Sequence, residues 1–243
     1  MHFAGQKAVI TGASSGIGQA IAAGLARQGA ALWVVGRSRA RLEQALCSAA
    51  PSALSISAIE ADLGTPGGAS RAACELLAQL DGSLDVLVHC AGAISLGSIE
   101  NAPVEELDAQ YHVNLRAPFV LTQALLPLLR NSRGQVVFVN STAGLKANAN
   151  ASQYSATKHG LRALADSLRD EENRNGVRVL SVFSGRASTP MQRAITGWEG
   201  KEFHPEYLLQ PDDVASAMLH SLTLPRTAEL TDLSLRPFRK YPE

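Results

Sequence analysis

The residues best suited to chemistry in this sequence are a tyrosine and a lysine four positions apart, Tyr154 and Lys158. Residues at this spacing share one face of a helix. A phenol has an ordinary pKa of about 10, which is poorly placed for proton transfer at neutral pH. A nearby ammonium favours phenolate, so we expect Lys158 to pull the pKa of Tyr154 toward the working range. Ser141, thirteen residues before Tyr154, can donate a hydrogen bond to a substrate carbonyl oxygen as it becomes an alkoxide.

A second candidate for chemistry is the glycine-rich stretch T-G-A-S-S-G-I-G at residues 11–18. It follows an apolar strand and opens a helix, where glycines let the backbone turn tightly and approach a pyrophosphate. The phosphate charge then faces free amides at the helix N-terminus. The last glycine also allows the helix to pack close to the strand. The expected phosphate-binding residues are Gly12, Ser14, Ser15, Gly16, Ile17 and Gly18.

The same stretch satisfies G-x-S-x-G, the nucleophile elbow of a hydrolase, with Ser14 as the nucleophile. A hydrolase also needs an oxyanion loop from an earlier strand, followed by an acid and a histidine. Here the motif follows the first strand, so no earlier strand supplies that loop. The dinucleotide interpretation is therefore favoured over the hydrolase.

The end of the second predicted strand indicates which dinucleotide is used. An acidic residue about 20 positions past the loop binds a ribose 2′-hydroxyl, whereas an arginine accommodates a 2′-phosphate. Here the strand ends in V-V-G-R-S, with Arg37 nineteen residues past Gly18 and no carboxylate. A guanidinium pairs with phosphate in a planar fork, and Ser38 adds a hydroxyl. Arg37 predicts NADP(H) rather than NAD; the alternative is that it only solvates the next helix.

Strand and helix patterns alternate along the chain, which predicts an α/β fold. The early strands are apolar throughout, as a sheet covered on both faces requires. We expect a single Rossmann-like, doubly wound parallel sheet of about seven strands with helices on both faces. The strands are expected at residues 7–11, 31–35, 54–61, 84–89, 135–140, 177–183 and 230–235. The longest helix is expected over residues 103–130, bent at Pro118 and Pro127.

Length and composition indicate a folded, single-domain protein. The 243 residues suit one domain over 1–243, and 46% hydrophobic with 18% charged residues predict a packed core. The formal net charge of zero gives no electrostatic case for nucleic acid or an anionic membrane. No apolar run reaches the roughly 20 residues that a bilayer requires, and the start lacks a secretory signal. The cysteines, expected as reduced and mostly buried thiols of a cytoplasmic protein, are Cys47, Cys74 and Cys90.

The glycine loop, Ser141 and the Y-S-A-T-K motif at residues 154–158 together resemble the short-chain dehydrogenase/reductase family over nearly the whole chain. The chain is most similar to the small NADP-dependent hydroxy-acid and carbonyl reductases of that family, partly because of its short tail. Y-x-x-x-K alone is common by chance, but its combination with the upstream serine and the glycine loop is highly specific. The resemblance implies hydride transfer by a nicotinamide, with Ser141, Tyr154 and Lys158 at the catalytic site.

The resemblance assigns further roles. Asn114 matches an asparagine that kinks the long helix and anchors a water linking the lysine to bulk solvent. Asp62 and Leu63 match a pair whose acidic side chain contacts the adenine amino group, and a turn or helix cap is the alternative role for Asp62. Lys158 also binds the nicotinamide ribose hydroxyls, and Thr189 meets the carboxamide. A homodimer or homotetramer is implied, with contacts through the long helix and the Tyr154 helix.

Two segments depart from the family pattern. Where N-N-A-G is usual, this chain has H-C-A-G at residues 89–92. Ala91 and Gly92 keep the backbone close to the cofactor, His89 is expected as a structural substitute, and Cys90 as a small buried residue. Ser184 replaces a proline, which loosens the backbone beside the nicotinamide. Ser15 also stands where many NADP users of the family carry a basic residue.

Residues 184–210 are too long for a plain connection and are expected to form a substrate lid. Met191 and the lid aromatics either line an apolar pocket or pack the lid down; the aromatics are Trp198, Phe203, His204 and Tyr207. Arg186 or Arg193 either receives a substrate carboxylate or lies on the surface.

The expected function is that of a cytoplasmic oxidoreductase that interconverts a ketone or aldehyde and an alcohol with NADP(H). A short hydroxy acid is one candidate substrate, and no metal is needed. The alternative, from another class, is a regulatory protein that binds NADP without turnover. Such proteins typically lose the tyrosine or the lysine, and this chain keeps both.

Overall fold

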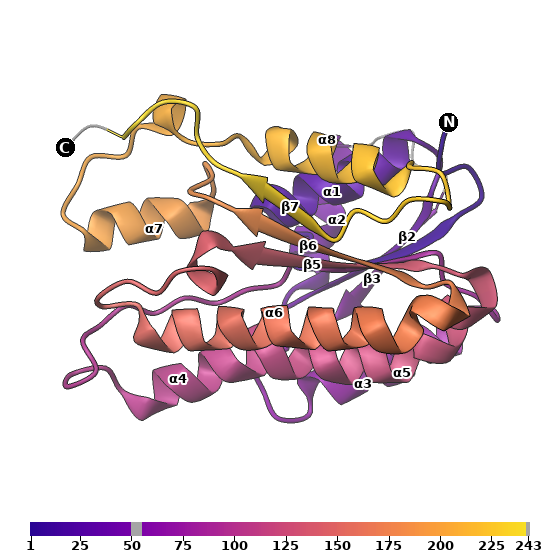
Figure 1. Cartoon of the computed structure of the whole chain (residues 1–243), viewed down its shortest axis with the longest axis horizontal. Coiled ribbons are helices and arrows are strands. Elements are labelled where there is room, and N and C mark those ends of the chain that lie inside the picture. The colour runs from indigo at the N-terminus through magenta and orange to yellow at the C-terminus, as the bar shows by residue number, and fades with distance from the viewer. Residues whose placement is uncertain (50–54, 242–243) are drawn as a thin grey trace.

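The computed structural model describes residues 1–49 and 55–241. Its centre is one parallel sheet of seven strands in the order β3-β2-β1-β4-β5-β6-β7 (Figure 1). This confirms the predicted Rossmann-like α/β fold. The strands are β1 (Lys7–Thr11), β2 (Ala31–Gly36), β3 (Ile56–Glu60), β4 (Val86–His89), β5 (Gln135–Ser141), β6 (Arg178–Ser184) and β7 (Asp232–Leu235). The first part of the strand expected at 54–61 lies outside the described residues.

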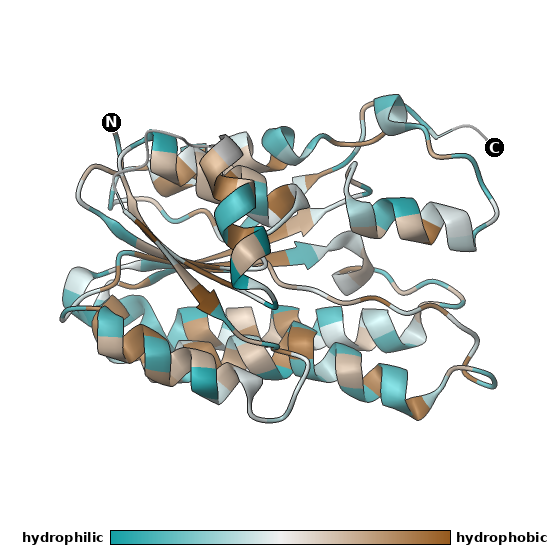
Figure 2. Cartoon of the chain, turned by 180° about the vertical axis from the view of Figure 1, so that it is seen from behind, coloured by the Kyte–Doolittle hydropathy of each residue, from teal (hydrophilic) through white to brown (hydrophobic). Residues whose placement is uncertain are grey.

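Helices cover both faces of the sheet. One face carries α1 (Gly16–Arg27), α2 (Arg39–Ala49) and α8 (Pro211–Leu222). The other carries α3 (Gly68–Gln79), α4 (Val104–Tyr111), α5 (Ala117–Ser132) and α6 (Ser152–Glu172). Figure 2 shows apolar colour along the strands between these layers. Two apolar cores result, one on each side of the sheet, as the uninterrupted apolar strands require.

The helical region from 104 to 132 is not one continuous helix. A π-helical turn, His112–Arg116, separates α4 from α5, with Asn114 at its middle. Pro118 lies in the first turn of α5, where its missing N–H costs little, and Pro127 lies inside the helix. The interruption of α geometry thus falls at Asn114, before the first proline. Insertions of this kind are frequent at functional sites.

The order of the strands indicates where a ligand crevice lies. β1 pairs with β2 on one side and with β4 on the other, so the strand order reverses there. In doubly wound sheets, ligands bind beyond the carboxyl ends of the strands at such a point. The residues that follow β1 and β4 are the glycine loop and Cys90–Gly92. The sequence motifs therefore meet at the edge where a ligand is expected.

The segment 184–210 lies at the same end of the sheet as these motifs (Figure 1). It contains α7 (Pro190–Trp198) and a short 3-10 turn, Pro205–Tyr207. The chain end packs against it, because the Tyr241 hydroxyl donates to the Glu202 carbonyl and accepts from the His204 amide at 3.0 Å. Among the described residues, no helix is long and apolar enough to span a membrane.

Candidate active site

The glycine loop and the end of β4 are held together by Thr11. Its Oγ1 accepts hydrogen bonds from the Cys90 and Ala91 amides, each at 3.1 Å. The Gly12 amide donates to the Val35 carbonyl at 2.8 Å. The Thr11 side chain and the Gly12 backbone thus fix the two walls of the crevice relative to each other.

Three glycines of the loop are required by space and conformation. Gly12 has φ +73°, and a Cβ there would stand 2.7 Å from the Ala91 Cα. A Cβ on Gly18 would stand 2.3 Å from the Gly12 carbonyl oxygen, which confirms the close packing expected of that position. Gly16 has φ +56° and begins α1, while Ser15 at the N-cap makes no side-chain capping bond. The first amides of α1 are thus left for an external anion, which fits a dinucleotide pyrophosphate.

The structure brings Ser141, Tyr154 and Lys158 together. Ser141 ends β5, while Tyr154 and Lys158 lie on the first turns of α6. The Tyr154 hydroxyl is hydrogen-bonded to the Ser141 side chain. The Lys158 Nζ lies 5.8 Å from the centroid of the Tyr154 ring and donates to the Val139 carbonyl at 3.1 Å. A hydroxyl, a phenol and an amine therefore converge on one point.

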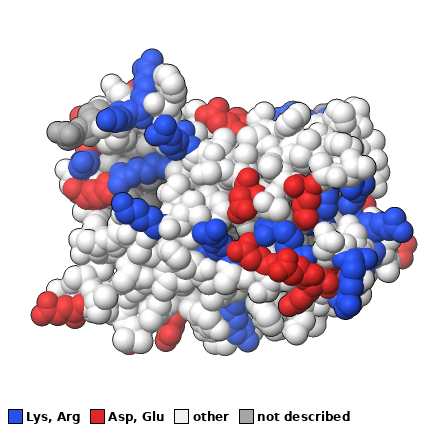
Figure 3. All heavy atoms as spheres, viewed as in Figure 1, with Lys and Arg blue, Asp and Glu red and all other residues white. Residues whose placement is uncertain are grey.

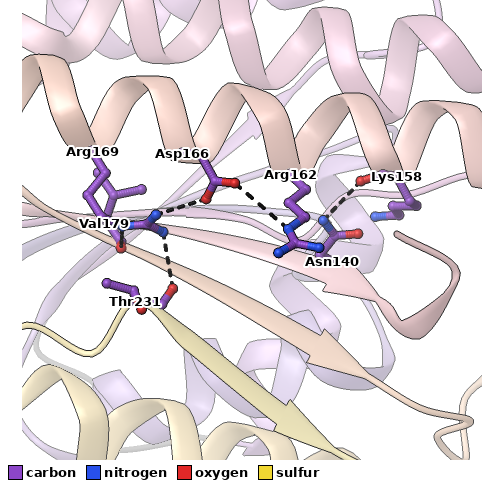
Figure 4. A network of polar contacts seen from close by, with 7 residues as sticks. All are labelled: Asn140, Lys158, Arg162, Asp166, Arg169, Val179 and Thr231. Carbon is purple, nitrogen blue, oxygen red and sulfur yellow. Dashed lines mark hydrogen bonds and ion pairs between the residues drawn. The ribbon is translucent and has the colours of Figure 1, made fainter. Parts of the chain in front are cut away.

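Asn140 positions this trio and was not anticipated from the sequence. Its side chain donates to the Lys158 carbonyl at 3.1 Å (Figure 4). It also accepts from the Ser141 amide at 2.8 Å. It thus ties the end of β5 to the helix that carries the tyrosine and lysine. The signal in the sequence was a polar residue ending an otherwise apolar strand, directly before Ser141.

Further along α6, two arginines and an aspartate anchor the helix (Figure 4). Asp166 pairs with Arg169 at 2.8 Å and with Arg162 at 3.8 Å. Arg169 also donates to the Val179 carbonyl at 3.1 Å and the Thr231 carbonyl at 3.2 Å, next to the strands β6 and β7. Asn140 thus ties the first half of α6 to the sheet and Arg169 ties its second half. These contacts hold Tyr154 and Lys158 in place.

Burial dominates the electrostatics of the site. Partial burial raises the pKa of Tyr154 to about 12, although the hydrogen bond with Ser141 lowers it. Burial also lowers the pKa of Lys158 to about 8. The expectation that Lys158 pulls the tyrosine pKa toward neutrality is wrong for the protein alone. The desolvation of the phenolate outweighs an amine that is directed at the Val139 carbonyl.

Cys90 is a neighbour of the catalytic groups that sequence reasoning treated only as a small buried residue. It is half-buried and lies close enough to Tyr154 and Lys158 that its charge, when ionised, would act on both groups. Burial raises the pKa of its thiol to about 12, while Lys158 lowers it. The other cysteines contradict the expectation of mostly buried thiols, since Cys47 and Cys74 are exposed. Cysteine spacing carries no information on exposure.

Asn114 and His89 are buried residues that link the elements around the crevice. The Asn114 side chain is 1% exposed, exchanges two hydrogen bonds of 2.8 Å with the backbone of Ala93, and donates to the Thr157 Oγ1 at 3.0 Å. It thereby joins the β4 loop to α6. His89 is buried, stacks on Phe138 and shares a 2.8 Å hydrogen bond with Thr122. Burial lowers the pKa of His89 to about 3, so it is neutral and links β4 to α5.

The residues expected to bind the adenosine half of the dinucleotide follow the ends of β2 and β3. Arg37 is exposed and makes no ion pair or hydrogen bond with the described residues. The Asp62 Oδ1 accepts from the Gly64 amide at 2.9 Å, which gives this carboxylate a role in a turn. The Leu63 side chain is buried in the core, so its backbone is the part left to meet a ligand.

The residues of the segment 184–210, expected to form a lid, divide between packing and the crevice. The Thr189 Oγ1 caps α7 by accepting from the Gln192 amide, and its methyl would stand 2.9 Å from a Cβ on Gly16. The Met191 Cε would stand 3.8 Å from a Cβ on Gly92. The rings of His204, Tyr207 and Tyr241 pack on one another, whereas Trp198 is exposed. Thr189 and Met191 thus lie over the crevice, while His204 and Tyr207 pack the segment against the ring of Tyr241.

A model of the family described as short chain dehydrogenase matches residues 6–200. The chain belongs to this family. It is 32% identical over 241 residues to an uncharacterized oxidoreductase of Staphylococcus epidermidis, covering 95% of this chain and 96% of that protein. This short-chain dehydrogenase is an oxidoreductase by these relationships.

Solved structures agree on the fold. An alcohol dehydrogenase from the archaeon Thermococcus sibiricus, complexed with 5-hydroxy-NADP, matches with a TM-score of 0.86 and 29% identity, covering 98% of this chain and 99% of that one. A putative gluconate 5-dehydrogenase from Beutenbergia cavernae with bound NADP matches with a TM-score of 0.85 and 29% identity, covering 95% of each chain.

Proposed function

We propose that this short-chain dehydrogenase interconverts a ketone or aldehyde and the matching alcohol with NADP(H). The observation that carries the proposal is the meeting of Ser141, Tyr154 and Lys158 beside the glycine loop. When bound, the nicotinamide supplies or accepts the hydride. The residues suited to hold the dinucleotide are Gly12, Ser14, Ser15, Gly16, Ile17, Gly18, Arg37, Asp62, Leu63, Ala91, Gly92, Tyr154, Lys158 and Thr189.

The protein's own groups manage the substrate oxygen. In the reductive direction, Ser141 donates a hydrogen bond to the carbonyl oxygen, and Tyr154 gives its hydroxyl proton as the oxygen becomes an alcohol. Lys158, held by the Val139 carbonyl, supplies the positive charge that stabilises the resulting phenolate. Asn140 and Asn114 fix the relative positions of the strand, the loop and the helix.

The preference for NADP rests on Arg37. Its guanidinium is exposed and unpaired among the described residues, at the strand end where a 2′-phosphate is expected. Two structural relatives near 29% identity hold NADP-type ligands, which supports the same choice.

A homodimer or homotetramer in the cytoplasm completes the proposal. The region of α4 and α5 exposes large apolar side chains, among them Val104, Tyr111 and Phe119. Such a surface is suited to a subunit contact. A monomer in sedimentation experiments at micromolar concentration would contradict this part.

Tyr154→Phe tests the mechanism, because it keeps the ring and removes the transferable proton. NADPH oxidation with a panel of ketones, aldehydes and oxo acids should fall by a factor on the order of a hundred or more, within the contribution usual for general acid catalysis. NADPH binding, followed by fluorescence, should persist. Tyr111→Phe, which changes an exposed tyrosine of α4, is the matched control and should retain activity.

Two outcomes would count against the proposal. Near-normal turnover by Tyr154→Phe would remove the tyrosine from the proton transfer. Tight NADPH binding by the wild type without oxidation of NADPH by any carbonyl in the panel would instead favour the regulatory alternative.

A further inference from the structure

A cavity of about 470 Å³ opens beside the first turns of α7. Its lining residues are Ser188, Thr189, Pro190, Arg193, Ala194 and Phe203. This volume is in the range of small-molecule sites. Figure 3 shows basic side chains around a hollow at the side of the molecule where α7 lies.

The cavity adjoins the crevice through Thr189. That residue lines the cavity, and its methyl lies against Gly16 of the glycine loop. Arg193 follows four positions later, so it stands on the same face of α7 about one turn away. The Arg193 amide donates to the Thr189 carbonyl at 3.0 Å, which confirms the helical turn between them.

Arg193 is held in place but has no anionic partner. The guanidinium carbon lies 4.1 Å from the centroid of the Phe203 ring, a cation–π contact that holds the group against the ring. No carboxylate of the described residues pairs with it. Its N–H groups therefore remain free to bind a ligand at the cavity wall.

Arg186 and three carboxylates of the segment 184–210 already have partners within the protein. Arg186 forms a two-pronged ion pair with Glu199, one bond measuring 2.8 Å. Glu202 and Glu206 both lie beside His204, at 3.7 Å and 3.2 Å. Of the two arginines that the sequence offered for a substrate carboxylate, Arg186 is thus engaged within the protein, and Arg193 is available.

We propose that Arg193 receives a carboxylate of the substrate, so that the preferred substrates are oxo acids and the matching hydroxy acids. This inference rests on the proposed carbonyl–alcohol function and names its substrate class. A planar guanidinium pairs with a carboxylate through two parallel hydrogen bonds. Pro190, Arg193 and Ala194 are exposed, so the pair forms at the mouth of an open cavity, with the Phe203 ring behind the guanidinium.

The test compares oxo acids with their methyl esters, which have the same carbon chain and no charge. The wild type should reduce oxo acids with a higher kcat/KM than the esters, across a series in which the carbonyl and carboxylate are separated by one to four carbons. Arg193→Gln should lower kcat/KM for the best acid by roughly ten- to a hundredfold, the range for loss of a charge-assisted contact. The value for its ester should stay nearly unchanged.

Two further variants sharpen the comparison. Arg193→Lys keeps the charge without the planar fork and should recover part of the activity on the acid. Lys201→Gln removes a positive charge from the same segment at a residue that does not line the cavity. It should leave kcat/KM unchanged for both the acid and the ester. The Kd for NADPH should be the same in all four proteins.

The contrary outcomes are distinct from one another. Unchanged activity of Arg193→Gln on the acid, or an equal loss on acid and ester, would overturn the carboxylate assignment. A weaker Kd for NADPH with an unchanged acid-to-ester ratio would assign Arg193 to the cofactor phosphates instead. Failure of the wild type to reduce acids, esters, ketones and aldehydes would overturn the proposed function and this inference with it.

Discussion

Replacing Lys158 by methionine should abolish turnover and make the cofactor-free protein more stable at neutral pH. Lys158 is 4% exposed, and burial lowers its pKa from 10.5 to about 8. The fold therefore disfavours the charged amine that the unfolded chain tolerates. Methionine is a flexible apolar side chain that can fill the same space without a charge.

The magnitude follows from that pKa shift. One pKa unit corresponds to about 1.4 kcal/mol, so the buried charge costs about 3 kcal/mol of the free energy of unfolding at pH 7. Methionine also removes the hydrogen bond to the Val139 carbonyl, which is worth about 1 kcal/mol. The variant should thus gain about 2 kcal/mol at pH 7.

The gain should disappear as the pH rises. A lowered pKa means that the folded protein releases the lysine proton above about pH 8, while the unfolded chain holds it to about 10.5. The cost is complete below about pH 8 and falls to about 1 kcal/mol at pH 10. Tyr154 and Cys90 have raised pKa values, so they make the folded protein less stable as the pH rises. Wild type and Lys158→Met both contain these two residues, so their effect is common to the comparison.

Urea denaturation of wild type and Lys158→Met at pH 7 and pH 10 measures this difference. Lys146→Met, at an exposed lysine, is the control and should show no pH-dependent gain. A variant less stable than wild type at pH 7, or a difference that does not shrink by pH 10, would refute the reasoning. Retained activity would separately refute the catalytic role of the amine.

Two further predictions concern the cofactor and the lid. Arg37→Ala should weaken NADPH binding roughly ten- to a hundredfold and leave NADH binding nearly unchanged, because only NADPH carries the 2′-phosphate. Fluorescence titration measures the Kd of both cofactors. Equal kcat/KM of the wild type with NADH and NADPH would contradict the assignment. Amide hydrogen exchange in residues 184–210 should be fast without ligands and slow when NADPH and substrate are added. Exchange there as slow as in β4 and β5 before any addition would show that the segment is not a lid.

The sequence predicted the fold because its signals are periodic and local. Apolar strands separated by amphipathic helices admit few arrangements, and the alternation specifies a parallel sheet covered on both faces. Strand β7 begins at Asp232, later than expected, because the Glu229 carboxylate accepts the Val179 amide at 2.8 Å in place of a strand partner.

The site was predictable in position but not in electrostatics. Tyr154, Lys158 and Ser141 are placed by spacing and strand ends, both of which can be read from residue types. Burial depends on contacts between distant segments, so the raised pKa of Tyr154 could not be read in the same way. Asn140 escaped notice for a related reason, since its two partners lie on different elements. The choice between Arg186 and Arg193 likewise depended on Glu199, which only the folded lid brings to Arg186.

The protonation states of the free site match one direction of the reaction. With a pKa of about 12, Tyr154 keeps its proton at neutral pH and so can act as the acid that carbonyl reduction requires. Alcohol oxidation needs the phenolate instead, which burial disfavours. The hydrogen bond with Ser141 reduces this cost, and Lys158, the nearby cation that could support a phenolate, itself begins to lose its proton at about pH 8. Oxidation therefore gains a base and loses its supporting cation as the pH rises, whereas reduction is supported by both groups at neutral pH.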